Sequence, residues 1–312
     1  MKNICKINAK EENMLKNIPF EGIYISGFSD EISSDFDIQL DVVKKLGMEY
    51  ISIRGVDGKN IGDFTLEEFK ENVEPRLKEK NIKISSIGSP IGKIFIDDEA
   101  GFEKQKEILH TLCQIANLVG CKYIRIFSFY INKNENFDEF SDEVLSKLNQ
   151  FVEIAKKYNI ILLHENEKDI YGDTISRCVN MFEKINSKYF QAIFDFANFV
   201  QVGENTMEAY TKLEKYIKYY HIKDAVSYDN QNVVCGTGEG QIKEILKNAL
   251  KKGYNGFLTL EPHLVLFDSL KDLELSDVND IIKDNKGLDS KEAYALQYNS
   301  LIDILEEIKE ER

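Results

Sequence analysis

Four apolar segments of the chain end in ionisable side chains of types that bind metal ions. The run IILLHEN contains Glu165, FDFAN contains Asp195, HIKD contains His221 and LEPHL contains Glu261. A buried strand that ends in charged groups is unfavourable unless those groups find partners. Three carboxylates and one imidazole make a site rich in oxygen with one nitrogen, and this site suits Mn²⁺, Mg²⁺, Co²⁺ or Zn²⁺. If the four segment ends meet, we predict that they hold one divalent metal ion.

The elements that must bring these residues together follow from the pattern of apolar residues. Short β-rich apolar runs alternate with longer amphipathic segments, such as residues 37–47, 104–120 and 242–253, each of which ends at a glycine. A glycine is the usual residue just after the C-terminus of a helix. The expected strands are residues 22–28, 49–55, 83–88, 123–129, 160–166, 191–197, 219–224 and 256–262. Eight strand–helix units predict an α/β fold, a (β/α)8 TIM barrel.

A doubly wound open sheet is the alternative fold. It usually has fewer strands, and it needs a phosphate-binding glycine loop after the first strand. The segment SGFSDE, which follows the first expected strand, has no GxGxxG motif. The barrel is therefore favoured, and in such barrels the active site lies at the carboxyl ends of the strands.

Two segments lie outside the repeat. Residues 1–20 are an expected N-terminal leader, and residues 21–312 are expected to form a single barrel domain. An acidic connection at about residues 265–289 follows the last strand. Such a long loop is either a lid or a solvated insertion, and the sequence leaves both open.

Composition restricts the partners of the protein. The net charge of −14 disfavours a nucleic acid or an anionic membrane as partner. The five cysteines are odd in number and form no CxxC motif, which is typical of a reduced, cytoplasmic location. The N-terminus has no apolar signal core, and no apolar run has the length of a membrane span. A homodimer is a further expectation.

Each single residue also has an ordinary structural explanation. A lone Glu or His at a strand end more often anchors a loop than binds a metal. His164 should point away from Glu165, because side chains alternate along a strand. His110 falls in an apolar helix and is expected to pack there. What favours a metal site is the set of four residues on four adjacent strands.

Other polar residues near the expected strand ends are candidates for substrate binding. Arg54 and Arg125 lie inside expected strands, where they either bind an anion or form internal salt bridges. The motif GTGEG (236–240) resembles a phosphate-binding loop, although a tight turn into a helix is favoured because its Glu239 would repel phosphate. The expected substrate-binding residues are Glu31, Arg54, Lys93, Arg125, Asn198, Lys223 and His263.

Motifs along residues 20–264 resemble one known superfamily. GFSDEI, SSIGSPIGK, HENEKDIYGD, FDFANFVQVG and LTLEPHL are similar to segments of the sugar phosphate isomerase/epimerase superfamily, which has a xylose isomerase-like barrel. The resemblance implies a metal set of Glu, Asp, His and Glu, which falls on the four residues named first.

This sequence departs from the resembled pattern at three places. Asn198 stands where the epimerases commonly have His, and Lys223 and Asp224 occupy a region where they tend to have Arg. The second and third expected strands end without the histidines that a trinuclear endonuclease site requires, and this disfavours DNA cleavage.

The resemblance implies an enzyme that isomerises or epimerises a sugar, a sugar phosphate or a related keto-polyol through an enediolate. Glu165 and Glu261 are the expected catalytic residues, and Asp195 and His221 are mainly structural ligands. One alternative is a metal-dependent dehydratase or lyase of a keto-sugar or keto-inositol. Another is a catalytically weak sugar-binding barrel.

Overall fold

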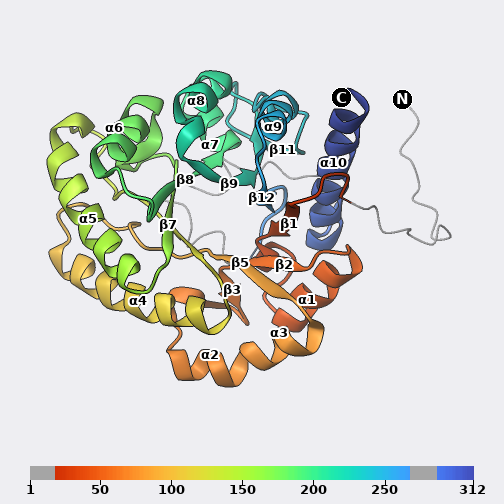
Figure 1. The fold of residues 1–312 in the computed structure, drawn as a ribbon, viewed down its shortest axis with the longest axis horizontal. Coiled ribbons are helices and arrows are strands. Elements are labelled where there is room, and N and C mark those ends of the chain that lie inside the picture. Colours follow the sequence, from red (N-terminus) through yellow and green to blue (C-terminus); the bar gives the residue numbers. More distant parts are fainter. Residues whose placement is uncertain (1–17, 268–286) are drawn as a thin grey trace.

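The eight predicted strands are all present, and they form one parallel sheet that curves into a barrel (Figure 1). The computed structural model describes residues 18–267 and 287–312. The strands are β1 (Ile23–Gly27), β2 (Tyr50–Ile53), β5 (Lys83–Ile87), β6 (Tyr123–Ile126), β7 (Ile161–Glu165), β8 (Phe190–Asp195), β9 (Ile217–Ile222) and β12 (Gly256–Leu260). Their order is β1-β12-β9-β8-β7-β6-β5-β2, and a parallel bridge between Phe28 and Ser52 joins the two ends.

Helices surround the sheet and cover its outer face. They are α1 (Phe36–Lys45), α2 (Leu66–Asn72), α3 (Glu74–Lys80), α4 (Glu99–Leu118), α5 (Ser141–Lys157), α6 (Ile175–Ile185), α7 (Phe196–Gln201), α8 (Thr206–Leu213), α9 (Ile242–Lys251) and α10 (Ser290–Glu310). The predicted glycine stops are confirmed, since Gly47, Gly120 and Gly253 all have positive φ angles just after a helix.

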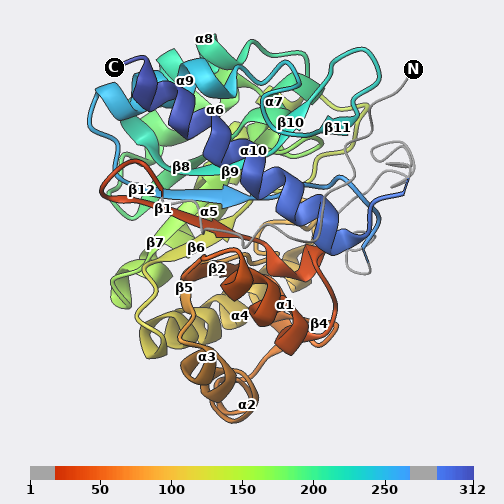
Figure 2. The ribbon, with the colours of Figure 1, turned by 90° about the vertical axis from the view of Figure 1, so that its right-hand side faces the viewer.

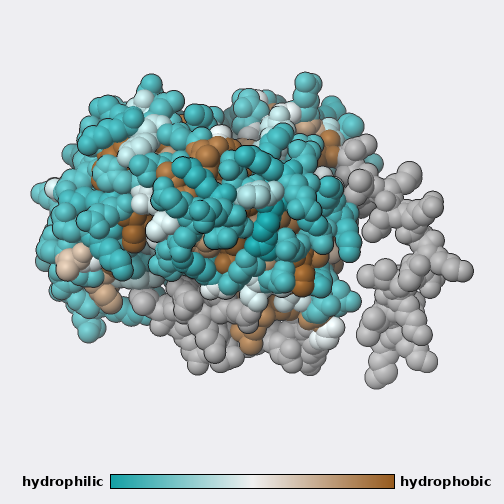
Figure 3. Space-filling view, turned by 90° about the horizontal axis from the view of Figure 1, so that it is seen from below, coloured by the Kyte–Doolittle hydropathy of each residue, from teal (hydrophilic) through white to brown (hydrophobic). Residues whose placement is uncertain are grey.

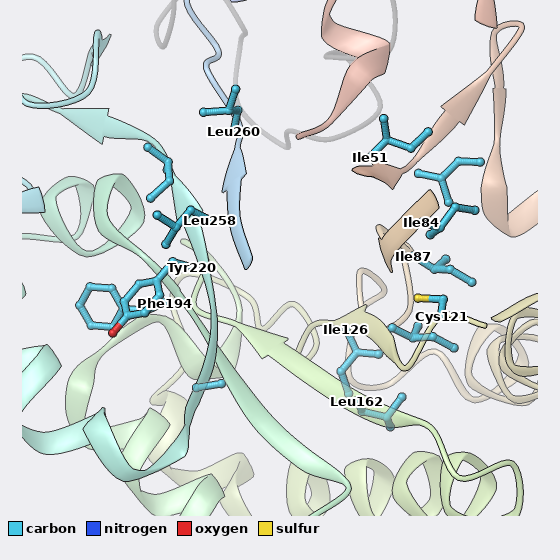
Figure 4. Packing of buried hydrophobic residues seen from close by; sticks show 14 of the residues in the cluster. Ile51, Ile84, Ile87, Cys121, Ile126, Leu162, Phe194, Tyr220, Leu258 and Leu260 are labelled. Atoms are coloured by element: carbon cyan, nitrogen blue, oxygen red, sulfur yellow. The ribbon is translucent and has the colours of Figure 1, made fainter. Parts of the chain in front are cut away.

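The hydrophobic core is formed where strand side chains meet these helices. Figure 4 shows such side chains from several barrel strands, among them Ile84 of β5, Leu162 of β7 and Leu258 of β12. All three are at most 5% exposed. The strand side chains that face the helices are mainly apolar, because parallel barrel strands are buried under the helices on that side. This core fixes the strands whose ends carry the polar residues.

Two short hairpins extend the carboxyl ends of two strands. β3 (Gly55–Val56) pairs with β4 (Lys59–Asn60) after β2, and β10 (Asp224–Ala225) pairs with β11 (Asn232–Val233) after β9. They lie on the same end of the barrel as the predicted site.

The C-terminal helix α10 was not predicted from the sequence. Asp289 and Glu292 form a capping box at its N-terminus, and the helix lies beside β1 and β12 (Figure 2). Its Gln297 donates a hydrogen bond to the carbonyl of Ile222 at 3.0 Å. A Cβ at Gly27 would lie 1.9 Å from the Tyr294 hydroxyl oxygen, so only glycine fits at the end of β1.

Parts of the predicted domain plan fall outside the described residues. This is so for most of the expected leader (1–20) and most of the connection at about 265–289. On the face of the molecule shown in Figure 3, hydrophilic residues predominate and apolar residues lie between them. In the part of the chain that is described, no helix has both the length and the apolar character needed to cross a bilayer.

Candidate metal and active site

The four predicted metal ligands lie together at the carboxyl ends of neighbouring strands. Glu165 is the last residue of β7, Asp195 ends β8, His221 lies in β9 and Glu261 directly follows β12. Because β7, β8, β9 and β12 are adjacent in the sheet, one ligand atom from each residue lies within 4.8 Å of all the others. All four residues are buried, with at most 3% of their surface exposed.

His221 is at the centre of the cluster. Its Nδ1 atom lies 2.6 Å from Oε1 of Glu165 and 3.1 Å from Oε2 of Glu261. The ring of Phe28 meets the imidazole edge to face, with centroids 5.1 Å apart. The imidazole is therefore held with one nitrogen facing both glutamates.

The pKa values reflect a buried excess of negative charge. Burial lowers the pKa of His221, but Glu165 and Glu261 raise it more strongly, to about 9. Burial raises the pKa of Asp195 to about 8, against the effect of Lys223. Burial also raises the pKa of Glu261, but Lys223 and His221 lower it more strongly, well below its usual range. The cluster thus attracts a positive charge to the space between its carboxylates.

The donor set fits a divalent cation. Oδ2 of Asp195 and Oε2 of Glu261 are buried and accept no hydrogen bond of regular geometry within the described residues, and Lys223 lies 3.3 Å and 3.7 Å from them. Buried carboxylate oxygens that lack a regular hydrogen bond are rare, because a nearby charge alone compensates only part of their desolvation. A cation between these oxygens, Glu165 and His221 would supply that compensation, and such mixed oxygen and nitrogen ligands suit Mn²⁺, Mg²⁺, Co²⁺ or Zn²⁺.

Asp195 is oriented by the turn between β8 and α7. Its Oδ1 caps α7 by accepting a hydrogen bond from the backbone N–H of Asn198 at 2.8 Å. The side chain of Asn166 bonds both the backbone N–H and the carbonyl of Asp195 at 3.0 Å. Asn198, a predicted substrate-binding residue, donates from Nδ2 to the carbonyl of Asn166 at 2.8 Å. The two asparagines therefore hold Asp195 in place, and sequence reasoning missed Asn166.

Arg54 and Arg125 form internal ion pairs, which was one of the two alternatives from the sequence. Arg54 lies 2.8 Å from Asp30, 3.4 Å from Glu31 and 3.1 Å from Glu261. Arg125 lies 3.1 Å from Oε2 of Glu165. Both guanidinium groups lie over the Phe28 ring, at 4.3 Å and 4.9 Å from its centroid. Each arginine therefore fixes one oxygen of a predicted catalytic glutamate.

The two predicted lysines are also paired. Lys223 lies 3.3 Å from Oδ2 of Asp195 and 3.7 Å from Oε2 of Glu261. Lys93 lies 3.3 Å from Oε2 of Glu167. Sequence reasoning did not assign a role to Glu167. The sequence did carry a signal for it. Side chains two residues apart along extended chain lie on the same face, so Glu167 was expected on the side of Glu165.

His263 and Glu31 lie together on the opposite side of Glu261. Oε2 of Glu31 accepts a hydrogen bond from the backbone N–H of His263 at 2.8 Å, and the His263 ring lies 3.4 Å from Oε1 of Glu31. His263 has a φ of +45°, which is uncommon outside glycine. Ligand atoms of Glu31, Glu261 and His263 also lie close enough for a metal ion. However, the Arg54 guanidinium already supplies a cation to both glutamates there.

The remaining candidates have structural roles. His164 points away from the cluster, as predicted: it bonds Ser128 at 2.9 Å, and burial lowers its pKa to about 3. His110 packs against Tyr158. In the GTGEG motif, the backbone N–H groups of residues 236, 238 and 240 all donate to the carboxylate of Asp224 at 2.9–3.0 Å. This loop is therefore a turn that an internal aspartate fills.

The sequence of this chain matches the model of one protein family, described as the xylose isomerase-like TIM barrel, over residues 40–274. The chain belongs to this family. The match covers every barrel strand except β1, together with all four residues of the candidate metal site. It confirms the resemblance and the fold class predicted from the sequence.

Part of this chain is similar in sequence to a curated protein. Over 140 residues the protein is 22% identical to the probable L-ribulose-5-phosphate 3-epimerase UlaE of Mycoplasma pneumoniae. The matched part covers 45% of this chain and 46% of that relative, so the chain spans less than half of the relative's length.

Solved structures of the same fold cover nearly the whole chain. The IOLI protein with a bound zinc atom has a TM-score of 0.70 at 17% identity and covers 91% of this chain and 98% of its own. A D-tagatose 3-epimerase-like protein has a TM-score of 0.70 at 18% identity, with coverages of 92% and 99%. At these identities the likeness concerns the fold.

Proposed function

We propose that this protein is a divalent-metal-dependent isomerase or epimerase of a sugar or a related keto-polyol. Glu165, Asp195, His221 and Glu261 would hold the ion. The observation that carries the proposal is the meeting of three buried carboxylates and one imidazole within 4.8 Å, at the end of the barrel where such folds place their active sites. The relatives described above support the carbohydrate class of the substrate.

The two glutamates are arranged to transfer protons. Each has one oxygen directed to the Nδ1 atom of His221 and the other held by an arginine, Arg125 for Glu165 and Arg54 for Glu261. A guanidinium beside a carboxylate favours its ionised form, which accepts a proton. A bound divalent ion would polarise neighbouring carbonyl and hydroxyl oxygens and so acidify the proton on the carbon that joins them.

The proton is then moved by this chain's own side chains. One glutamate takes the proton from the carbon beside the carbonyl, and the same or the opposite glutamate returns it. Return to the other face inverts that carbon. Return to the former carbonyl carbon, with transfer of the hydroxyl proton to the former carbonyl oxygen, moves the carbonyl group. Asp195 keeps its position through its Asn166 and Asn198 hydrogen bonds and serves as a ligand.

The variant Glu165→Gln tests this proposal. It keeps the size of the side chain but removes a charged ligand and the proposed base, so we expect metal content to fall and substrate-dependent exchange of deuterium from D₂O to drop at least ~100-fold. Elemental mass spectrometry and proton NMR measure the two effects. The control is Glu153→Gln, which replaces an exposed glutamate on α5 that pairs with Lys156; it should change neither quantity.

The outcomes separate the alternatives. Exchange with a product that keeps the composition of the substrate, apart from the incorporated deuterium, supports isomerisation or epimerisation. A product that has lost one water points to the dehydratase. A wild-type protein that takes up no Mn²⁺, Co²⁺, Mg²⁺ or Zn²⁺ would contradict the proposal. Sugar binding by that metal-free protein would favour the sugar-binding barrel.

A further inference from the structure

Among the described residues, four cations face the candidate site, and each pairs with carboxylates of the same chain. Arg54 pairs with three acidic residues, Arg125 with Glu165, Lys223 with Asp195 and Glu261, and Lys93 with Glu167. The side chains of the first three are at most 4% exposed, and that of Lys93 is 10% exposed. An incoming anion would have to compete with a buried ion pair for each of them.

Carboxylates also outnumber these cations. The acidic groups in the pairs are Asp30, Glu31, Glu165, Glu167, Asp195 and Glu261. Lys168 is next in sequence to Glu167 and is half-buried. Because each of the four paired cations already faces a carboxylate, a phosphate dianion would gain little attraction in this region even with a divalent ion bound.

The backbone offers no replacement in the part of the chain that the structure describes around β9. The glycine-rich loop 236–240 has the successive N–H groups that form an anion cradle. Its anion position is taken by Asp224, whose two oxygens accept from residues 236, 238 and 240. A Cβ at Gly238 would lie 2.4 Å from Oδ1 of Asp224, so the carboxylate fills the loop closely.

From these contacts we infer that the substrate carries no phosphate: it is an uncharged polyhydroxy ketone, recognised by its hydroxyl and carbonyl oxygens. This inference rests on the proposed function, and it narrows the substrate class of the same site. It differs from what the name of the Mycoplasma relative would suggest, because that relative is named for a sugar phosphate. Uncharged hydroxyl groups can bond to carboxylates and arginines without separating the pairs.

The experiment compares matched ligands on the metal-loaded full chain. Deuterium exchange is measured with the four 2-ketopentoses, which are the D and L enantiomers of xylulose and ribulose. It is also measured with the 5-phosphate of each. Binding of the corresponding pentitols and pentitol 5-phosphates is measured by calorimetry. We expect kcat/KM for the free ketose to exceed that for its phosphate at least ~100-fold. Each pentitol should likewise bind more tightly than its own 5-phosphate.

Binding separates failure of this inference from failure of the proposed function. Pentitol binding without exchange of any ketose would leave the inference supported while the proposed function fails. Tighter binding of a pentitol phosphate, or binding of neither class, would overturn the inference whatever the exchange result. Competitive inhibition by inorganic phosphate at millimolar concentration would also overturn it.

A variant gives a second, independent readout. Glu167→Gln releases Lys93 from its carboxylate while the four proposed ligands stay in place. We expect the preference for the free ketose over its phosphate to shrink about tenfold, because the substitution removes one negative charge that repels the anion. Glu153→Gln is the matched control and should leave the ratio unchanged. An unchanged ratio in Glu167→Gln would contradict the role assigned to this pair.

Discussion

Arg54 shows how individual charges are stabilised in this barrel. It is 2% exposed, and its guanidinium group faces Asp30, Glu31 and Glu261, which come from two distant parts of the chain. Burial alone would lower its pKa, but the three carboxylates raise it above the ordinary value. The ion pairs therefore offset the cost of burying both the arginine and the three carboxylates.

Replacing Arg54 should be costly at the residue scale. Arg54→Met keeps much of the apolar stem but leaves three buried carboxylates without their cation, so we expect the free energy of unfolding to fall by about 3–5 kcal/mol. Urea unfolding followed by circular dichroism measures the change. A loss below about 1 kcal/mol would contradict the role of this pairing.

Arg76 supplies the matched control. It pairs with Asp37 and Asp57, whose side chains are 59% and 53% exposed. Because such surface pairs are screened by solvent, Arg76→Met should lower the free energy of unfolding by about 1 kcal/mol or less.

At the scale of elements, a layer of hydroxyl groups crosses the barrel directly below the candidate site. The Tyr219 hydroxyl, two residues before His221 on β9, lies 2.8 Å from Ser85 and 3.0 Å from Ser86 of β5. Thr259 of β12 donates to it at 2.6 Å. The layer joins strands on opposite sides of the barrel, and it satisfies polar groups that no water reaches.

The variant Tyr219→Phe tests the importance of this layer. It removes one hydroxyl and leaves its partners with fewer hydrogen bonds, so we expect unfolding to become easier by about 1–3 kcal/mol. Thermal denaturation measures the change. Tyr24→Phe is the control: Tyr24 is 44% exposed, and its replacement should stay within about 0.5 kcal/mol of wild type. Equal effects of both changes on stability would mean that the buried Tyr219 hydroxyl stabilises the fold no more than an exposed one.

At the scale of the whole molecule, the closed barrel and its helices exclude solvent from four cysteines. Cys113, Cys121, Cys178 and Cys235 are at most 2% exposed and form no disulfide. Burial raises the pKa of Cys113, Cys121 and Cys235 to about 12, and that of Cys178 further. Since the thiolate is the reactive form, these thiols should be inert near neutral pH.

Thiol labelling therefore reports on the integrity of the barrel. In a Cys5→Ser variant, which removes the cysteine outside the described residues, we expect no rapid reaction with Ellman's reagent at pH 8. All four thiols should react after denaturation in guanidinium chloride. Rapid labelling of two or more thiols in the native variant would mean that the barrel opens on the time scale of the assay.

The sequence by itself determined the strands and the candidate ligand set. Alternation of apolar runs with amphipathic segments is a local property, and the eight strands lie where this pattern predicts them. Because parallel strands end at the same edge of a barrel, Glu165, Asp195, His221 and Glu261 had to meet once the strands were placed. Metal binding itself stays a prediction.

Only the tertiary structure decided which charges pair. Arg54 and Glu261 are 207 residues apart in the chain, and their contact is set by the closure of β1 and β2 on β12. The same holds for Asp224, which fills a glycine loop that resembles a phosphate cradle when read as sequence. The charge of a side chain limits which partners it can have. The distances in the folded chain then decide which of these partners it pairs with.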